Sequence, residues 1–145
     1  MKALIQRVKS ASVTINNDLY SKIGHGLLVF LGVEKGDTIE NAKKLADKLS
    51  KLRIFEDENE KMNKSIKDVQ GEMLIVSQFT LAGDCKKGTR PSFDKAAPPQ
   101  EAKQLYEEFI NLSKSYDIPV QTGQFQATMD IELVNDGPVT FMLEF

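Results

Sequence analysis

LLVFLGV, at residues 27–33, opens with the longest uninterrupted apolar run in the chain, Leu27 to Leu31. The run has the length of a strand and contains β-forming residues, which is typical of a central strand covered on both faces. Gly32 and Gly36 bracket its exit. The sequence therefore predicts a sheet with this segment in its interior, and the segments on either side have to cover it.

The segment before this strand predicts a β-hairpin. Ala11, Val13 and Ile15 alternate with polar residues, which is the period of a strand with one buried face. Asn-Asn-Asp at residues 16–18 supplies turn-forming side chains, and residues 19–23 then continue as a second strand. Residues 11–23 are therefore expected to form two antiparallel strands.

Two stretches show apolar residues at helical spacing. The first follows Asp37, which can cap a helix with Glu40 in its first turn, and extends to about Lys51. The second begins near Pro99, because proline is tolerated in the first turn, and ends before Pro119. The apolar positions are Ile39, Ala42, Leu45, Ala46 and Leu49 in the first helix and Ala102, Leu105, Tyr106, Phe109 and Ile110 in the second.

The middle of the chain contains shorter patterns. LRIF at residues 52–55 is a short strand candidate, whereas residues 62–69 have too weak a pattern to assign. Residues 73–76 are apolar and β-branched, and predict a buried strand. The polar residues 77–80 follow it directly, and polar tips on buried strands often mark functional sites.

Near the end of the chain, residues 127–133 and 139–145 each alternate apolar with polar side chains. Asn135-Asp136-Gly137 interrupts them with turn-forming residues, so this region predicts strand, turn and strand. The whole pattern predicts a single α+β domain over residues 1–145, with strand-rich mixed sheets and about two long amphipathic helices.

The composition excludes several classes of protein. Lys and Arg total 19 and Asp and Glu total 21, and the resulting net charge of −2 argues against binding nucleic acid by bulk attraction. One cysteine, Cys85, and one histidine, His25, exclude a disulfide scaffold and a structural zinc site. Neither residue has a visible partner for nucleophilic catalysis, and we expect no metal and no cofactor.

The location of the protein follows from what its sequence lacks. No apolar run approaches the ~20 residues that span a bilayer. The first ten residues, MKALIQRVKS, lack the apolar core of a signal peptide. We expect a cytoplasmic protein with no membrane segment.

The polar strand end Ser77-Gln78-Phe79-Thr80 has two interpretations. Its hydroxyls and amide can simply satisfy neighbouring backbone groups. Alternatively, the Gln78 amide and adjacent backbone N–H groups can stabilise an oxyanion, which needs no titrating side chain. Thr80 is a possible nucleophile, although no base is visible near it in the sequence.

Two further segments also have a structural and a functional interpretation. The loop at residues 86–95 is locally basic, with Lys86, Lys87 and Arg90, and is either a solvated surface or a contact for phosphates. Gly137-Pro138 is either part of an ordinary turn or a cis dipeptide, because proline cannot donate to a strand ladder.

Four separated segments together resemble a known family. They are ALIQRV (3–8), VSQFTL (76–81), KKGTRPSF (86–93) and NDGPVT (135–140). They closely resemble the D-aminoacyl-tRNA deacylases, once called D-tyrosyl-tRNA deacylases, and the likeness extends over almost the whole chain. The resemblance implies a cytoplasmic homodimeric enzyme that hydrolyses the ester joining a D-amino acid to tRNA, and also glycine mischarged on tRNA-Ala.

The resemblance also implies roles for individual residues. Gln78, Phe79 and Thr80 are implied to be catalytic, with backbone groups near Phe79 and Thr80 stabilising the oxyanion and the tRNA's terminal 2′-hydroxyl assisting the attack. The residues implied to bind substrate are Ser77, Phe125, Ala127 and Met129. Contacts with tRNA are possible at Lys86, Lys87 and Arg90.

Chiral selection is implied to come from a second subunit. Gly137-Pro138 would be a cis dipeptide that each subunit inserts into its partner's pocket, with Arg7 helping to hold it. The side chain of an L-amino acid would then collide with the two carbonyl groups, whereas that of a D-amino acid would point away. Complete sites would exist only at the dimer interface.

One segment departs from the family pattern. The family commonly shows GxFGADM, whereas this chain has Gln126 and Thr128 in the corresponding segment, GQFQATM at residues 123–129. Gln126 is bulkier than glycine or alanine, so no pocket role is carried over to Gln126 or Thr128. Two alternative functions remain open at this point, a tRNA-binding module without catalysis and a hydrolase with Thr80 as nucleophile.

Overall fold

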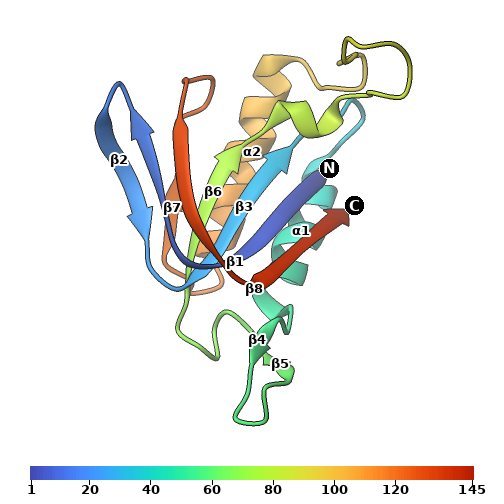
Figure 1. Ribbon diagram of the computed structural model, residues 1–145. Helices are drawn as coiled ribbons and strands as arrows, with labels where there is room; N and C mark the ends of the chain where they lie inside the picture. Colours follow the sequence, from blue (N-terminus) through green and yellow to red (C-terminus); the bar gives the residue numbers. More distant parts are fainter.

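The computed structural model describes residues 1–145 and shows a twisted mixed sheet with both long helices on one face (Figure 1). The sheet order is β2-β1-β3-β6-β7, with β8 paired to β1, and β4 and β5 form a separate two-stranded ribbon. The elements are β1 (Lys2–Ile15), β2 (Asp18–Ile23), β3 (Gly26–Gly32), α1 (Ile39–Lys51), β4 (Phe55–Glu56), β5 (Met62–Lys64), β6 (Glu72–Ser77), the 3₁₀ helix η1 (Phe79–Ala82), α2 (Pro99–Lys114), β7 (Val120–Thr122) and β8 (Asp130–Glu144). The predicted α+β class is confirmed.

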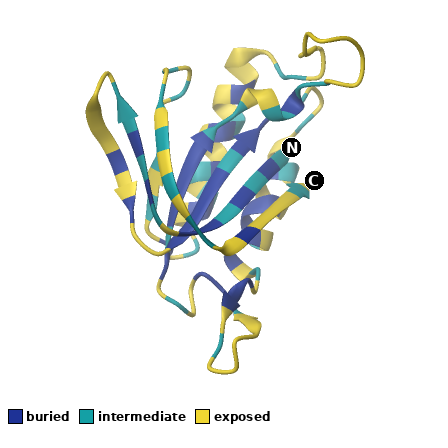
Figure 2. Cartoon of the chain, in the orientation of Figure 1, coloured by how far each residue is buried: buried dark blue, intermediate teal, exposed yellow.

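The apolar run at residues 27–33 occupies the centre of the sheet, as predicted. β3 lies between β1, with which it is antiparallel, and β6, with which it is parallel. Phe30 is its only residue that is not fully buried. Figure 2 shows the buried residues concentrated on β3, β6 and the first half of β1.

β1 is a long strand whose two halves pair with different neighbours. Its first half, from Lys2 to Val8, pairs with β3, and residues 11–15 pair with β2 in the predicted hairpin. This second half curves over the face of the sheet that the helices leave open (Figure 1). A second apolar cluster fills the space between this curved half and the central strands β3 and β6. It consists of Val8, Ala11, Val13, Ile23, Leu28, Leu74 and Val76.

Both helices form where their apolar spacing predicts them, and they cover the larger core. The predicted cap of α1 is wrong by one residue, because the N-cap is Thr38. The backbone N–H and the hydroxyl of Thr38 both donate to Asn41 Oδ1 at 2.8 Å. Asp37 is occupied elsewhere, since its carboxylate accepts the N–H of Glu34 at 2.7 Å and the amino group of Met1 at 2.5 Å.

The prediction of strand, turn and strand at the end of the chain is wrong. β8 is one strand that runs antiparallel to β1, and Val8 pairs with Asn135 while Gln6 pairs with Thr140. Residues 136–139 therefore bulge out opposite Arg7. The turn-forming residues make a bulge without reversing the chain, because β1 continues as a pairing partner on both sides of it.

The shorter predictions are confirmed only in part. Of the LRIF segment only Phe55 lies in a strand, the two-residue β4, and the unassigned residues 62–69 contribute the short strand β5. The strand predicted to start near residue 127 starts at Asp130. No helix of the chain has both the length and the apolar character that crossing a membrane requires.

Gly26 sits where β3 approaches β6 most closely, since a Cβ built there would lie 1.8 Å from the carbonyl oxygen of Glu72. We expect Gly26→Ala to lower the free energy of unfolding by about 3 kcal/mol, because the two paired backbones have to separate. The measurement is urea denaturation. Gly36→Ala is the control, because a Cβ there meets no atom within 4 Å, and its φ of +88° predicts a loss of only about 1 kcal/mol. Equal losses would contradict the close approach.

Candidate active site

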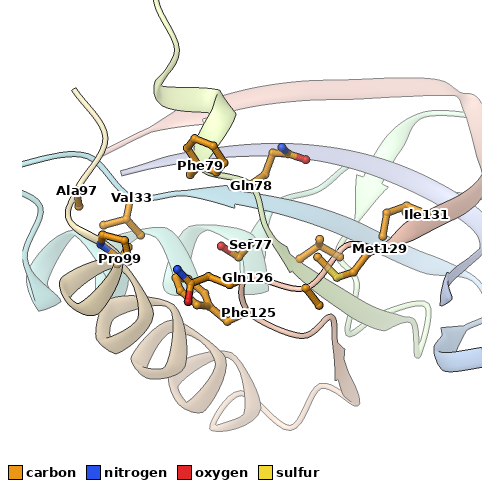
Figure 3. A pocket seen from close by; sticks show the side chains of 13 residues that line it. Val33, Ser77, Gln78, Phe79, Ala97, Pro99, Phe125, Gln126, Met129 and Ile131 are labelled. Carbon is orange, nitrogen blue, oxygen red and sulfur yellow. The ribbon is translucent and has the colours of Figure 1, made fainter. Parts of the chain in front are cut away.

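A cleft of about 580 Å³ opens at the carboxyl ends of β3 and β6 (Figure 3). Six residues implied by the family resemblance line it, and they are Ser77, Gln78, Phe79, Phe125, Ala127 and Met129. The start of α2 closes it on another side, with Pro99 and Ala102, and Val33 after β3 and Ala97 complete that wall.

Parallel pairing brings the two halves of the cleft together. β7 pairs with β6 so that Thr122 lies beside Ile75, and the N–H of Gly123 donates to the Ile75 carbonyl at 2.9 Å. Because parallel strands end at the same edge, the segment after β6 and the segment after β7 meet there. The loop before α2 is held by the N–H of Ala97, which donates to the Val33 carbonyl at 3.0 Å.

No side chain that lines the cleft ionises near neutral pH. Its polar side chains are Ser77, Gln78 and Gln126, and the other side chains that line it are apolar. No group of three or more His, Cys, Asp and Glu side chains lies close enough to hold a metal ion. The cleft itself therefore offers hydroxyl, amide and backbone groups to a substrate.

The backbone turns sharply where β6 ends. The N–H of Gln78 donates to the Leu31 carbonyl at 2.7 Å, and the chain then enters η1, where the N–H of Leu81 donates to the Gln78 carbonyl at 3.2 Å. The N–H groups of Phe79 and Thr80 open this 3₁₀ helix and have no partner within it. They are suited to binding an oxygen that becomes negatively charged.

The side chain of Thr80 lies outside the set that lines the cleft, unlike its three neighbours in the motif. Its hydroxyl accepts a hydrogen bond from the amide nitrogen of Gln78. No titratable side chain is hydrogen-bonded to this hydroxyl. The geometry thus gives Thr80 an orienting contact with Gln78 and no base.

Tyr106 supports the cleft from behind, and the sequence indicated only that it belongs to the apolar face of α2. Its hydroxyl donates to the Ile75 carbonyl at 3.0 Å, and its ring packs against Phe125 with centroids 5.7 Å apart. Burial raises the pKa of Tyr106 well above its usual value, so the hydroxyl stays a neutral donor. Tyr106 therefore fixes β6 and one wall of the cleft together.

Gln126 lies beside Phe125 and projects into the cleft towards Ser77 (Figure 3). It belongs to the turn in which the Ala127 N–H donates to the Gln124 carbonyl, and its φ is +63°. Glycine adopts that left-handed conformation freely, whereas glutamine does so at a cost. The departure from the family pattern therefore adds both bulk and an amide to the cleft.

Gly137 and Pro138 lie apart from the cleft, at the exposed tip of the β8 bulge. Their peptide bond is cis. Arg7 is buried beneath them, at 4% exposure, and its Nε donates to the Asp136 carbonyl at 3.1 Å. Arg7 thus contacts the bulge directly.

The basic loop lies near the cleft without lining it. Lys86, Lys87 and Arg90 are exposed, and Lys86 borders a separate hollow with Lys2 and Lys95. His25 and Cys85 also lie outside the cleft. Apart from the side chain of Thr80, the predicted site residues therefore form three groups, which are the cleft, the bulge with Arg7, and the basic loop.

A family model described as D-Tyr-tRNA(Tyr) deacylase matches residues 4–144 of this sequence. The chain belongs to this family. The deacylase resemblance seen in the four sequence segments is confirmed, and the protein is a member of a family of hydrolases.

Relatives named D-aminoacyl-tRNA deacylase match along their full length. The one from Thermodesulfovibrio yellowstonii is 57% identical over 143 residues, which cover 99% of this chain and 98% of the relative. The one from Thermosipho africanus is 58% identical over 144 residues, which cover 99% and 97%. The similarity therefore extends over nearly the whole of this chain and of each relative.

Solved structures share the fold. A structure described as c-Myc DNA Unwinding Element Binding Protein is 40% identical, with a TM-score of 0.94, and the match covers 100% of this chain and 99% of that one. A probable eukaryotic D-amino acid tRNA deacylase is 20% identical, with a TM-score of 0.82, and the match covers 98% and 97%. Because this second structure is only 20% identical, its likeness shows that the fold is shared and nothing further.

We expect Gln126→Gly to raise the free energy of unfolding by about 0.5–1 kcal/mol, because glycine relieves the left-handed backbone at φ +63°. Gln124→Gly is the matched control, since it removes the same side chain two positions earlier, where φ is not positive. This control should lose about 0.5–1 kcal/mol through the extra freedom of the unfolded chain. Thermal and urea unfolding measure both, and a loss at Gln126 equal to that at Gln124 would contradict the backbone assignment.

Proposed function

We propose that this protein hydrolyses the ester bond of D-aminoacyl-tRNA, and of glycyl-tRNA mischarged on tRNA-Ala, and spares L-aminoacyl-tRNA. The observation that carries the proposal is that Ser77, Gln78 and Phe79 line one cleft with Phe125, Ala127 and Met129, although the two motif segments lie far apart in the sequence. Family membership over residues 4–144 supports the same activity.

The reaction has to proceed without an acid or base from the cleft, because none of its lining side chains ionises near neutral pH. We propose that the 2′-hydroxyl of the terminal nucleotide assists water in attacking the ester carbonyl. The bond from that carbonyl to the 3′-oxygen breaks, and the 3′-oxygen takes the proton that the water loses. The products are a free amino acid and a tRNA with a free 3′-hydroxyl.

The protein's own contribution is to bind charge that develops on the carbonyl oxygen. The unpaired N–H groups of Phe79 and Thr80 are suited to this role, and the Gln78 side chain lies beside them. A donor aimed at such an oxygen is worth about 3–4 kcal/mol of transition-state stabilisation. The substrate-binding walls would be Ser77, Phe125, Ala127 and Met129.

Chiral selection would require a second copy of the chain. Gly137 and Pro138 are exposed and lie away from the cleft of their own chain, so they are available to reach a neighbour's cleft. Large apolar side chains on the same strand are exposed in the single chain, including Val134 at 51%, Phe141 at 42% and Met142 at 46%. Such a surface on a homodimer would be covered by the same surface of the partner.

Binding of the tRNA would be local. Lys86, Lys87 and Arg90 lie on an exposed loop that follows η1, close to the residues that form one end of the cleft. Their charges would contact phosphates, whereas the net charge of −2 would let the product leave. We propose that the enzyme works in the cytoplasm, where charged tRNA is found.

A nucleic-acid-binding module without catalysis is the second candidate. It is favoured by one observation, the 40% identity to a protein described as c-Myc DNA Unwinding Element Binding Protein. This candidate predicts binding of tRNA without turnover and an affinity that falls steeply with salt. The primary proposal predicts turnover.

We expect the purified protein to release the amino acid from D-tyrosyl-tRNA and to leave L-tyrosyl-tRNA intact. The physical reason is that only the D-isomer can direct its side chain away from the carbonyl groups of Gly137 and Pro138. Single-turnover deacylation of matched D- and L-substrates measures this preference. Equal rates on the two, or no hydrolysis of either, would contradict the proposal.

Thr80→Ala separates the proposal from a Thr80 nucleophile in the same assay. Loss of a true nucleophile typically lowers kcat by about a million-fold. The proposal predicts a loss of roughly tenfold or less, because the change removes only the hydroxyl that Gln78 contacts and keeps the backbone N–H. Complete loss in a folded variant would favour the nucleophile.

A further inference from the structure

Arg7 carries a charge that is nearly removed from water, with its side chain 5% exposed. Two carboxylates neutralise it from different elements of the fold. Asp136 Oδ2, on β8, lies 3.3 Å from Nε, and Glu56 Oε1, on β4, lies 3.3 Å from Nη2. A buried guanidinium needs both charge and hydrogen-bond partners, so its orientation depends on both neighbours.

The β4 segment holds the other edge of the guanidinium group. Nη1 of Arg7 donates to the Ile54 carbonyl at 2.8 Å, directly before β4 begins. Phe55 is 1% exposed, so this part of the chain is anchored in the core. The planar group is thus fixed between the base of the β4–β5 ribbon and the bulge of β8.

A second contact joins the same two parts of the fold. The ring of His25 packs edge-on against Phe55, with centroids 5.2 Å apart, and its Nε2 lies 3.8 Å from Asp136 Oδ2. The ribbon base therefore reaches Asp136 both through Arg7 and through His25. Neither route is visible in the sequence, because these residues come from β1, β4, β8 and the turn between β2 and β3.

The bulge is also anchored at its far end, where Val139 is 5% exposed and belongs to the larger core. Residues 136–139 have left the ladder with β1, and within the bulge the Val139 N–H donates to Asn135 Oδ1 at 3.1 Å. A Cβ built on Gly137 would lie 3.1 Å from Arg7 Nη2, which places the guanidinium directly against the bulge. The position of Gly137 and Pro138 therefore depends on the guanidinium group on one side and on the buried Val139 on the other.

We infer that Glu56 is a positioning residue for chiral selection, which fixes Arg7 and through it the Gly137-Pro138 bulge. This inference rests on the proposed function. Rejection of L-substrates depends on steric contact, and displacement of a positioned group by about 1 Å can change a rate by about a hundred-fold. Glu56 is 48% exposed and reaches only one edge of the guanidinium, so its loss should have a smaller effect.

The test compares Glu56→Ala with Glu58→Ala by single-turnover deacylation of D- and L-tyrosyl-tRNA. Glu58 is the matched control, because it lies in the same ribbon and pairs with Lys64 at 2.6 Å, and it makes no contact with Arg7. We expect Glu56→Ala to raise the L-rate relative to the D-rate by roughly tenfold. Glu58→Ala should leave that ratio at the wild-type value.

Glu56→Gln is the conservative variant, since its amide oxygen can still accept from Arg7 Nη2. It should recover most of the preference for the D-isomer, which a loss of overall stability would not explain. Melting curves show whether each variant is folded at the assay temperature. A folded Glu56→Ala with the wild-type ratio, or one in which both rates fall in proportion, would overturn the inference.

The two proposals fail in different ways. If the wild-type protein prefers the D-isomer and Glu56→Ala keeps that preference, the positioning role is wrong and the proposed function stands. If the wild-type protein hydrolyses neither isomer, the proposed function is wrong and the positioning role falls with it. A ratio shift shared by Glu56→Ala and Glu58→Ala would also contradict a role specific to Arg7.

Discussion

The buried charge of Arg7 constrains the β8 bulge at residues 136–139, which carries the exposed Gly137 and Pro138. A guanidinium group that is removed from water must be paired, and here carbonyl and carboxylate oxygens of the β4 segment and of β8 supply the pairs. β8 leaves its ladder with β1 at residues 136–139, and Asp136 in this bulge contacts the guanidinium group. The bulge therefore exposes Gly137 and Pro138 to solvent, while the buried guanidinium group of Arg7 contacts it from beneath.

The cleft at the ends of β3 and β6 has the opposite character. Its walls are mostly apolar and its polar groups are hydroxyl, amide and backbone, which is a lining suited to binding a substrate and stabilising charge. Tyr106 and the pairing of β6 with β7 keep the two walls together. In the proposed reaction the substrate supplies a hydroxyl, the cleft supplies donors, and the bulge of a second copy supplies the selection between isomers.

Sequence patterns predicted those features that depend on local order. The buried strand at residues 27–33, the first hairpin and both helices follow from periodicity, because each buries a face that its own residues define. The cap of α1 was misplaced, since Asp37 binds Met1 and Glu34 instead. The single strand β8 and the contacts of Glu56 and Tyr106 could not be predicted, because they depend on partners far away in the sequence.

The central claim is that catalysis and chiral selection lie on different copies of the chain, and subunit mixing tests it most directly. Gly137→Ala should lose selectivity, because its Cβ would lie 2.8 Å from Val139 Cγ2 at φ +128°. Ala127→Trp should fill the cleft and keep an intact bulge. Co-refolding Gly137→Ala with an excess of Ala127→Trp should restore the preference for D-tyrosyl-tRNA. A preference that is unaffected by the added subunit would contradict the account.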